Sequence, residues 1–443
     1  MSGALSRLVG TRRAIEWEDR FRYSAAVRWA LCQWKLARTP RCDDTDAQGL
    51  AKAIEHLCGA ARMAPHDDLL HEIEGEIMRL AARLGRQRFD WGKFEPASGS
   101  KAVEKGIVLK PWVSEREKGV VFISFESQVT RLLRHVDLEA FARRYLLVMS
   151  PSWSRPHCLL LAALPQVHPG PIFTLVSNPE DLGTFARLSP RYVPVPLYAS
   201  NWVNPDWVKP LPFERKDIDL VMVANFGKFK RHHALFKALR QMSPQLKLVL
   251  IGQHDGPRTR EVFLAEAAAF GVAGRFELRE SVPHAGVLDT LRRAKVSVIL
   301  SLREGSCVVV TESLFANTPV GLLEDAAIGS RVFINAATGR FLKHADLGLQ
   351  LMQFITEAQN FQPRRWALDN NISCFGSTAR LNQILKDHQL AAGQEWTTDL
   401  APLHWRPNPE FVHAHDRERM KPAFEDVRQR FGVEIGMPRL YEM

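Results

Sequence analysis

The sequence has no run of about 18 apolar residues, the length that a membrane-spanning helix needs. Residues 1–13 reach Arg12 and Arg13 without the apolar stretch of a secretory signal. The six cysteines are scattered and form no Cys-x-x-Cys pair, which argues against a zinc site and a disulfide framework. Internal repeats and low-complexity tracts are also missing. These absences predict a cytoplasmic protein with free thiols and no bound metal.

What is present fits a globular enzyme. Apolar residues make up 46% of the 443 residues and charged residues 24%, which is enough apolar material for two or three domain cores. The net charge of +10 favours anionic partners, unless it serves only solubility. No basic stripe interleaved with aromatic residues and no recognised nucleic-acid module occurs, so we expect no nucleic-acid partner.

Residues 1–100 are predicted to form a helical block that carries no chemical motif. Helices are expected near 24–36, 46–62 and 66–86, and Asp43, Asp44 and Asp46 offer caps for the second. Residues 1–41 hold nine Lys or Arg, three Asp or Glu, and three tryptophans. Such a segment suits peripheral contact with an anionic membrane at its inner face. The alternative is that these helices pad a small domain and bury their tryptophans.

Two strand–helix alternations follow this block. The first covers residues 106–215, with strands near 120–125, 146–150 and 172–176, and ends in a Pro- and Trp-rich linker. The second covers residues 216–375, with strands near 219–224, 247–251, 275–278, 296–300 and 319–323. We therefore predict an α/β fold in which two Rossmann-like domains face a cleft. A C-terminal helix and tail are expected over residues 376–443.

The clearest chemical signal is the segment 304–312, which reads Glu-Gly-Ser-Cys-Val-Val-Val-Thr-Glu between a predicted strand and a predicted helix. Gly305 allows a ligand to approach the backbone closely. The helix is expected to begin near Ser306, so its free N–H groups form an anion site suited to a diphosphate. Glu312, inside this helix, can accept hydrogen bonds from the vicinal diol of a ribose. The plainer interpretation is an ordinary helix with a solvated glutamate.

A second signal follows the strand predicted at 219–224. Residues 225–231 read Asn-Phe-Gly-Lys-Phe-Lys-Arg, which sets Lys228, Lys230 and Arg231 at a strand-to-helix turn. A departing diphosphate needs such neutralisation as its glycosidic bond breaks. A solvated basic turn is the plainer interpretation, and the motif gains weight only beside the first one.

Together these motifs resemble those of the retaining glycosyltransferases of the GT-B fold, family 4 (group 1). Glu304 and Glu312 match the two acidic residues that the family separates by seven others. Lys230 matches the lysine of the family's basic turn, where Asn225 stands at the usual arginine. Residues 316–320 are similar to the family's Ala-x-Gly-x-Pro-Val, with Asn317 at the usual glycine. Residues 281–284, which read Ser-Val-Pro-His and include Val282, Pro283 and His284, resemble the loop that packs on the nucleotide base.

The resemblance implies a nucleotide-sugar donor site in the second domain. It gives Glu304 the contact with the donor sugar, Glu312 the ribose, and Lys230 with Arg231 the diphosphate, so Glu304 and Lys230 are the candidate catalytic residues. The other candidate donor-binding residues are Asn225, Lys228, Val282, Pro283, Gly305, Ser306 and Cys307. It also implies transfer with retention to a glycan, lipid-linked or other acceptor, with no cofactor and no obligatory metal.

Departures from the family pattern leave a second interpretation open. Cys307 replaces the second glycine of Glu-Gly-x-Gly, Asn225 removes one cation, and the first alternation is short and lacks a Gly-Gly loop. A GT-B-like binding or scaffold subunit without turnover would also fit. His135 is a candidate acceptor-side residue, although an exposed histidine fits equally. His254 follows a strand end, whereas His232 and His233 are expected on a helix surface.

Overall fold

The computed structural model describes residues 11–43, 45–94, 102–405 and 408–436 and divides the chain into two units. The first unit comprises residues 1–24 and 203–373, and the second comprises residues 25–202 and 374–443. The chain passes between them at Ser24–Ala25, at Trp202–Val203 and at Ser373–Cys374. The structure therefore places the domain boundary earlier than residue 215, and it splits the expected 1–100 block between the two units.

The first unit is built on a six-stranded parallel sheet with the order β11-β10-β9-β6-β7-β8. Its strands are β6 (Ile218–Val223), β7 (Leu248–Gly252), β8 (Glu277–Glu280), β9 (Ala294–Ile299), β10 (Val320–Leu323) and β11 (Gly339–Leu342). The residues of β7 and β10 are all buried, because helices cover both faces of the sheet. All five predicted strands of this unit are confirmed within two residues, and β11 was not predicted.

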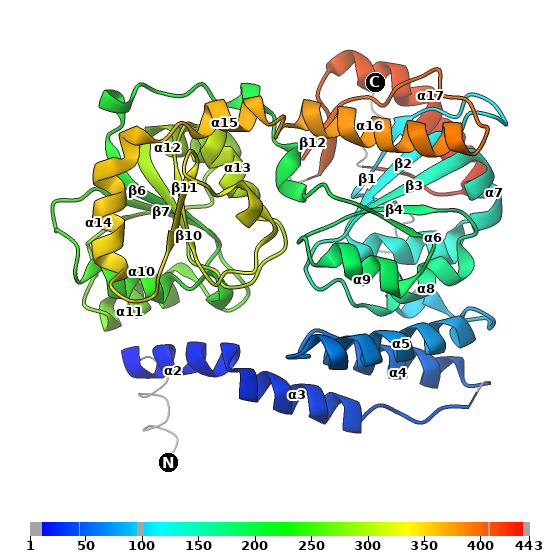
Figure 1. The fold of residues 1–443 in the computed structure, drawn as a ribbon, viewed down its shortest axis with the longest axis horizontal. Coiled ribbons are helices and arrows are strands. Elements are labelled where there is room, and N and C mark those ends of the chain that lie inside the picture. The colour runs from blue at the N-terminus through cyan, green and yellow to red at the C-terminus, as the bar shows by residue number, and fades with distance from the viewer. Residues whose placement is uncertain (1–10, 44, 95–101, 406–407, 437–443) are drawn as a thin grey trace. The chain divides into compact units, whose positions relative to one another are not determined.

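Helices lie on both faces of this sheet (Figure 1). One face carries α10 (His232–Leu239), α11 (Arg260–Ala269) and α14 (Leu347–Glu357), and the other carries α12 (His284–Arg293) and α13 (Val308–Phe315). Helix α15 (Pro363–Asp369) packs against α13. Helix α13 ends before Asn317, whose φ of +54° is left-handed, a conformation that Asn or Gly favours after a helix. That backbone requirement explains why Asn317 stands where the family has glycine.

The strand order of the first unit reverses between β6 and β9, which are neighbours in the sheet. The chain leaves β6 for a helix on one face and leaves β9 for a helix on the opposite face. Such a switch point opens a crevice beyond the carboxyl ends of the strands. The two candidate motifs, at 225–231 and 304–312, follow these two neighbouring strands.

The second unit has a five-stranded sheet in chain order, β1-β2-β3-β4-β5, with only β1 antiparallel to its neighbour. Its strands are β1 (Gly106–Lys110), β2 (Gly119–Ser124), β3 (Tyr145–Ser150), β4 (Ile172–Leu175) and β5 (Tyr192–Val195). The connecting helices are α6 (Val129–His135), α7 (Leu138–Arg144), α8 (Leu159–Val167) and α9 (Asp181–Leu188). The three predicted strands are confirmed, and β1 and β5 were not predicted.

The remaining segments of the second unit add layers to this sheet. The N-terminal helices are α3 (Ala25–Ala37), α4 (Ala47–Ala61) and α5 (Asp67–Leu84), and α4 and α5 pack against α8. Asp46 caps α4 by accepting a hydrogen bond from the Gly49 amide, as predicted. The C-terminal elements are α16 (Cys374–Ala391), β12 (Leu403–Trp405), β13 (Pro409–Phe411) and α17 (Ala414–Phe431).

The C-terminal segment is not a separate tail. The backbone N–H of Val103 donates to the carbonyl of Glu434, and α17 packs against β1. Short 3-10 helices occupy Trp91–Phe94, Glu126–Gln128, Ala199–Trp202, Pro205–Trp207, Phe213–Arg215, Lys228–Lys230, Gly329–Phe333 and Ala358–Asn360. Among the described residues, no helix combines the length and apolar character required to cross a membrane.

Helix α2 (Arg12–Tyr23) was not predicted and belongs to the first unit. Thr11 begins it by accepting a hydrogen bond from the Ala14 amide. The expectation that the N-terminal tryptophans are buried is wrong, because Trp17 is 66% exposed and Trp29 and Trp34 are about half exposed. Aromatic rings that face solvent do not serve as padding for a domain core.

Candidate active site at the strand-order reversal

The structure brings Glu304 and Lys230 together at the switch point. Glu304 follows β9 and is buried, and its Oε2 accepts a hydrogen bond from Lys230 Nζ at 2.6 Å. Lys230 ends the 3-10 turn after β6, and its ammonium lies 4.9 Å from the centre of the Phe229 ring. The two residues are 74 positions apart in the chain. Their pairing places a carboxylate and a cation where a sugar diphosphate would need both.

The contact with Lys230 gives a hydrogen bond to only one of the two carboxylate oxygens of Glu304. Its other carboxylate oxygen, Oε1, is buried and has no hydrogen-bond partner among the described residues. A buried polar atom without a partner is uncommon in a native structure and suggests a bound group that completes it. The hydroxyl groups of a sugar are donors that suit a carboxylate oxygen. The role of Glu304 toward a donor sugar stays a prediction.

Glu312 lies in α13 with a buried carboxylate, and its partner is His284, which the sequence analysis placed in the loop expected to meet the base without giving it a role. His284, the first residue of α12, lies with Nε2 2.7 Å from Glu312 Oε1. The edge of the His284 ring packs against Trp207 with 5.1 Å between ring centres. The histidine directly follows Val282 and Pro283, so the signal for it was present in the loop expected to meet the base. His284 holds the Glu312 carboxylate in one orientation.

Cys307 lies between Glu304 and Glu312 in the chain. It is buried at the N-terminus of α13, which begins at Val308, two residues later than expected. Burial raises the pKa of its thiol to about 12. The thiol itself is protonated at neutral pH and does not serve as a nucleophile.

The other two cations of the basic turn at 225–231, Lys228 and Arg231, form ion pairs with helix α2. Lys228 donates to both carboxylate oxygens of Glu18, at 2.7 and 2.6 Å. Arg231 donates to Asp19 from Nε and Nη2, at 3.0 and 2.8 Å. Arg231 also has a left-handed backbone, with a φ of +56°, which costs a non-glycine residue roughly 1–2 kcal/mol. Both carboxylates belong to α2, so this helix covers two of the three candidate cations.

The remaining candidate residues frame the same edge of the sheet. Asn225 Oδ1 accepts from the Gly227 amide at 3.3 Å and shapes the turn after β6. A side chain at Gly227 would require the side chains of Asp255 and Phe229 to shift. The carbonyl of Gly305 accepts a hydrogen bond from the Gly329 amide. This bond fixes residues 300–307, the loop between β9 and α13 that we call the donor loop. Ser306 and Val282 are partly exposed and Pro283 is exposed.

The positions and burial of three histidines, His135, His232 and His254, can be compared with the sequence predictions. His135 is the last residue of α6, the end remote from the carboxyl edge of its sheet, and it belongs to the second unit. The candidate donor residues belong to the first unit, so the acceptor-side role of His135 stays a prediction. His232 is not on a surface as expected: it is buried against Phe263, and burial lowers its pKa to about 3. His254 is half exposed and lies 2.6 Å from Glu280.

The described parts of the chain hold no cluster of three or more histidine, cysteine or acidic residues arranged for a metal ion. The cationic side chains and the N-terminus of α13 are the positive groups that this region offers to an anion. Backbone N–H groups at a helix start and a nearby ammonium suit a phosphate oxygen. The geometry thus fits a ligand with both a diphosphate and hydroxyl groups.

The profile of the family described as Glycosyl transferases group 1 matches residues 203–356, which lie within the first unit. This match supports glycosyl transfer as the class of activity. It covers both motifs, all candidate donor residues, and the boundary at Val203. The comparison with curated proteins found no match to this sequence.

Several solved structures have similar folds. Sucrose-phosphate synthase from Thermosynechococcus elongatus is 16% identical over 62% of this chain and 74% of its own, with a TM-score of 0.49. The trehalose 6-phosphate synthase from Burkholderia multivorans is 14% identical over 76% and 80%, with a TM-score of 0.46. Anabaena HepE, solved with UDP and glucose, is 15% identical over 61% and 77%, with a TM-score of 0.44. At these identities and TM-scores, the substrates of these proteins say nothing about the substrates of this chain.

Proposed function

We propose that this protein is a retaining glycosyltransferase whose first unit binds a nucleotide-sugar donor and whose second unit serves the acceptor. One observation carries the proposal. Within the segment that the family profile matches, Lys230 and Glu304 form a buried ion pair at the strand-order reversal, and Glu312 lies in α13, the helix that begins just after Glu304. Sequence spacing alone did not require Lys230 and Glu304 to meet.

Each part of the donor has a partner in this arrangement. The unpartnered Oε1 of Glu304 accepts a hydroxyl of the sugar, and Glu312 accepts the ribose diol once His284 releases or shares its oxygen. Lys230 neutralises the diphosphate together with the first N–H groups of α13. These groups differ in charge and in hydrogen-bonding capacity along the donor, so they fix its direction as well as its affinity.

The chemistry follows from charge development at the leaving group. As the bond between the anomeric carbon and the phosphate oxygen breaks, negative charge grows on the diphosphate, and the Lys230 ammonium stabilises it. With Glu304 engaged by Lys230, the phosphate oxygen is the base that takes the acceptor proton on the same face, which gives retention. Because the cations are side chains, we propose that the reaction needs no metal. Chelation by EDTA should leave the rate unchanged.

The competing proposal is a subunit that binds a donor and does not turn it over. The two departures at Asn225 and Cys307 favour it, and α2 covers Lys228 and Arg231. The two proposals differ in one measurement, the release of free sugar from a bound nucleotide sugar over time. Slow hydrolysis at a saturated site identifies an enzyme, and binding without release identifies the subunit.

The test begins with a thermal-shift panel of nucleoside diphosphates and nucleotide sugars on the full chain. At least one nucleotide sugar should raise the melting temperature, and Glu312→Ala should reduce that shift. The matched control is Glu324→Ala, which removes an exposed carboxylate after the neighbouring strand β10. If no nucleotide sugar binds the parent chain, or if both variants behave alike, the donor-site assignment fails. The anomeric proton of the first sugar released, followed by NMR, tests retention.

The outer face of α2 supports the further expectation of contact with an anionic membrane. Arg13, Trp17, Arg20 and Phe21 recur at helical spacing and are all exposed. Trp17 and Phe21 stack with ring centres 5.4 Å apart. Basic and aromatic side chains on one helix face suit an anionic lipid surface. Co-sedimentation with anionic vesicles should exceed that with neutral vesicles, and Trp17→Ala should reduce it; equal binding to both vesicles removes the proposal.

A further inference from the structure

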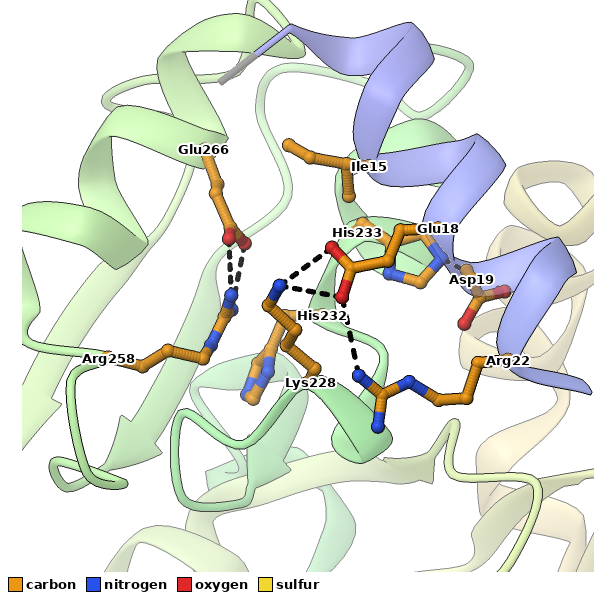
Figure 2. Close-up of a pocket in the computed structure, with 9 residues that line it drawn as sticks. All are labelled: Ile15, Glu18, Asp19, Arg22, Lys228, His232, His233, Arg258 and Glu266. Atoms are coloured by element: carbon orange, nitrogen blue, oxygen red, sulfur yellow. Dashed lines mark hydrogen bonds and ion pairs between the residues drawn. The ribbon is translucent and has the colours of Figure 1, made fainter. Parts of the chain in front are cut away.

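The inner face of α2 is an acidic surface that lies on the basic turn. Ile15, Glu18, Asp19 and Arg22 share one face of the helix at intervals of three and four residues. Figure 2 shows these four side chains turned toward a pocket whose opposite wall is formed by Lys228, His232, His233, Arg258 and Glu266 of the first unit. The helix therefore meets the turn at the start of α10, beside the candidate donor site.

Charge complementarity dominates this contact. Glu18 meets Lys228, and Asp19 meets both Arg231 and His233, whose Nε2 lies 3.4 Å from Oδ2. Burial raises the pKa of Asp19, but the hydrogen bonds from His233 and Arg231 outweigh it and hold the pKa below its ordinary value. Asp19 is thus a carboxylate anion in this contact. A carboxylate and a phosphate oxygen offer the same acceptor to a guanidinium.

Apolar packing contributes little to the docking of α2. None of its residues is buried, and its two large rings, Trp17 and Phe21, are 66% and 50% exposed. The Glu18–Lys228 pair is about half exposed, so salt weakens it and it contributes modestly to stability. The Asp19–Arg231 pair is only 11% and 8% exposed, so it is the contact that a competing anion must replace. A helix held mainly by ion pairs can leave its site without unfolding the unit beneath it once another anion takes its place at Arg231.

The C-terminal half of α2 also stands beside the donor loop. Arg231 Nη1 lies 3.5 Å from the carbonyl of Leu300, the residue after β9, and the Tyr23 ring lies 5.7 Å from the guanidinium. Arg231 is therefore shared between α2 and the strand that leads to Glu304. Its left-handed backbone keeps the guanidinium at this position. An anionic ligand that displaced the Asp19 carboxylate from Arg231 would therefore lie at the edge of the donor site.

We propose that α2 is an internal competitor of the donor, whose Glu18 and Asp19 occupy Lys228 and Arg231 until a diphosphate displaces them. This inference rests on the proposed function, because it takes the same turn as the diphosphate site. Competition is reciprocal: the diphosphate loosens α2, and loss of the α2 carboxylates strengthens diphosphate binding. The chain then holds its donor site closed with its own N-terminal helix.

The first experiment measures binding of inorganic pyrophosphate to the full chain by calorimetry. Asp19→Asn should lower the dissociation constant by roughly 5- to 150-fold, the usual range for coupled sites. The matched control is Glu16→Gln, which removes one charge from the same helix but lies beside Arg12 and Lys237. Equal affinity in the parent, Asp19→Asn and Glu16→Gln overturns the proposal, as does weaker binding by Asp19→Asn.

The second experiment uses the unaltered chain, so it does not depend on how a variant folds. Hydrogen exchange is compared with and without pyrophosphate. Residues 12–23 should exchange faster in its presence, and residues 225–231 should exchange more slowly. Slower exchange of both segments would show that α2 closes over the ligand, and this overturns the competition.

The two proposals fail in distinguishable ways. If a nucleotide sugar binds and pyrophosphate binds Asp19→Asn and the parent alike, the donor site stands and α2 is only a structural helix. If neither chain binds pyrophosphate or any nucleotide sugar, both proposals are wrong. Opposite changes in α2 and in the basic turn support both at once.

Discussion

Replacement of Lys230 by methionine tests whether the lysine ammonium stabilises the departing diphosphate. Methionine keeps an unbranched apolar stem and removes the ammonium, which lies 2.6 Å from Glu304. Because that charge matters most as the diphosphate departs, we expect the turnover number to fall about 10²- to 10³-fold, or roughly 2.7–4 kcal/mol of transition-state stabilisation. Donor affinity should fall much less, because α13 still offers its N-terminus to the ground-state diphosphate.

The same change should destabilise the first unit. Lys230 and Glu304 are 16% and 8% exposed, so the variant leaves a buried carboxylate whose Oε1 already has no partner. Removing one member of a buried pair costs about 3–5 kcal/mol. For a unit of this size, that corresponds to a fall in melting temperature on the order of 10 °C. Activity is therefore measured well below the new transition.

A double variant separates the two effects. Lys230→Met with Glu304→Gln replaces the buried ion pair by neutral groups, so stability should largely return while turnover stays low. The assay is release of free sugar from the nucleotide sugar that the panel identifies, with the dissociation constant measured in parallel. If Lys230→Met lowers affinity as much as turnover, its charge contributes only uniform binding. If turnover matches the parent at full saturation, the catalytic role of Lys230 is refuted.

The remaining predictions concern four other positions. Glu312→Ala should weaken nucleotide-sugar binding by roughly 1–3 kcal/mol, measured by calorimetry, because charge-assisted hydrogen bonds to the ribose are lost. His284→Ala should weaken binding less, and adding it to Glu312→Ala should change nothing further, since the histidine acts through that carboxylate; additive losses would contradict this. The Cys307 thiol, whose pKa burial raises to about 12, should resist iodoacetamide at pH 8 while the partly exposed Cys42 reacts, as followed by mass spectrometry; rapid labelling would contradict its burial. Burial raises the pKa of Asp181 to about 7 from 3.8, so the unfolded chain ionises first and stability of the second unit should fall as pH rises from about 4 to 7; Asp181→Asn should remove that dependence in denaturant melts.

The sequence by itself determined the parallel α/β character of both units and the position of the candidate motifs beside their strands. Buried strands of a parallel sheet are short β-branched runs with turn residues on both sides, and this local signal located β6, β7, β9 and β10 within two residues. The spacing of Glu304 and Glu312 across a strand–helix junction is also local. This spacing can therefore be recognised in a single sequence, without knowing which residues pack nearby.

Elements with weaker local signals were missed. Strands β1, β5 and β11 lie at sheet edges and contain glycine, proline or charged residues, so their patterns are poor. Helix α2 lacks an apolar stripe because its inner face is acidic, and only its partners in the first unit explain that face. The second unit recruits residues 374–436 through contacts such as Val103 with Glu434, which no local pattern encodes.

The tertiary structure alone decided which groups meet. Lys230 and Glu304 are 74 residues apart and are joined because β6 and β9 are neighbours at the strand-order reversal. His284 reaches Glu312, and Asp19 reaches Arg231 across 212 residues, by the same kind of long-range packing. A sequence records each residue's charge and its local conformational preference. Sheet order determines which charges become neighbours, and that order depends on how whole helices and strands bury their apolar faces.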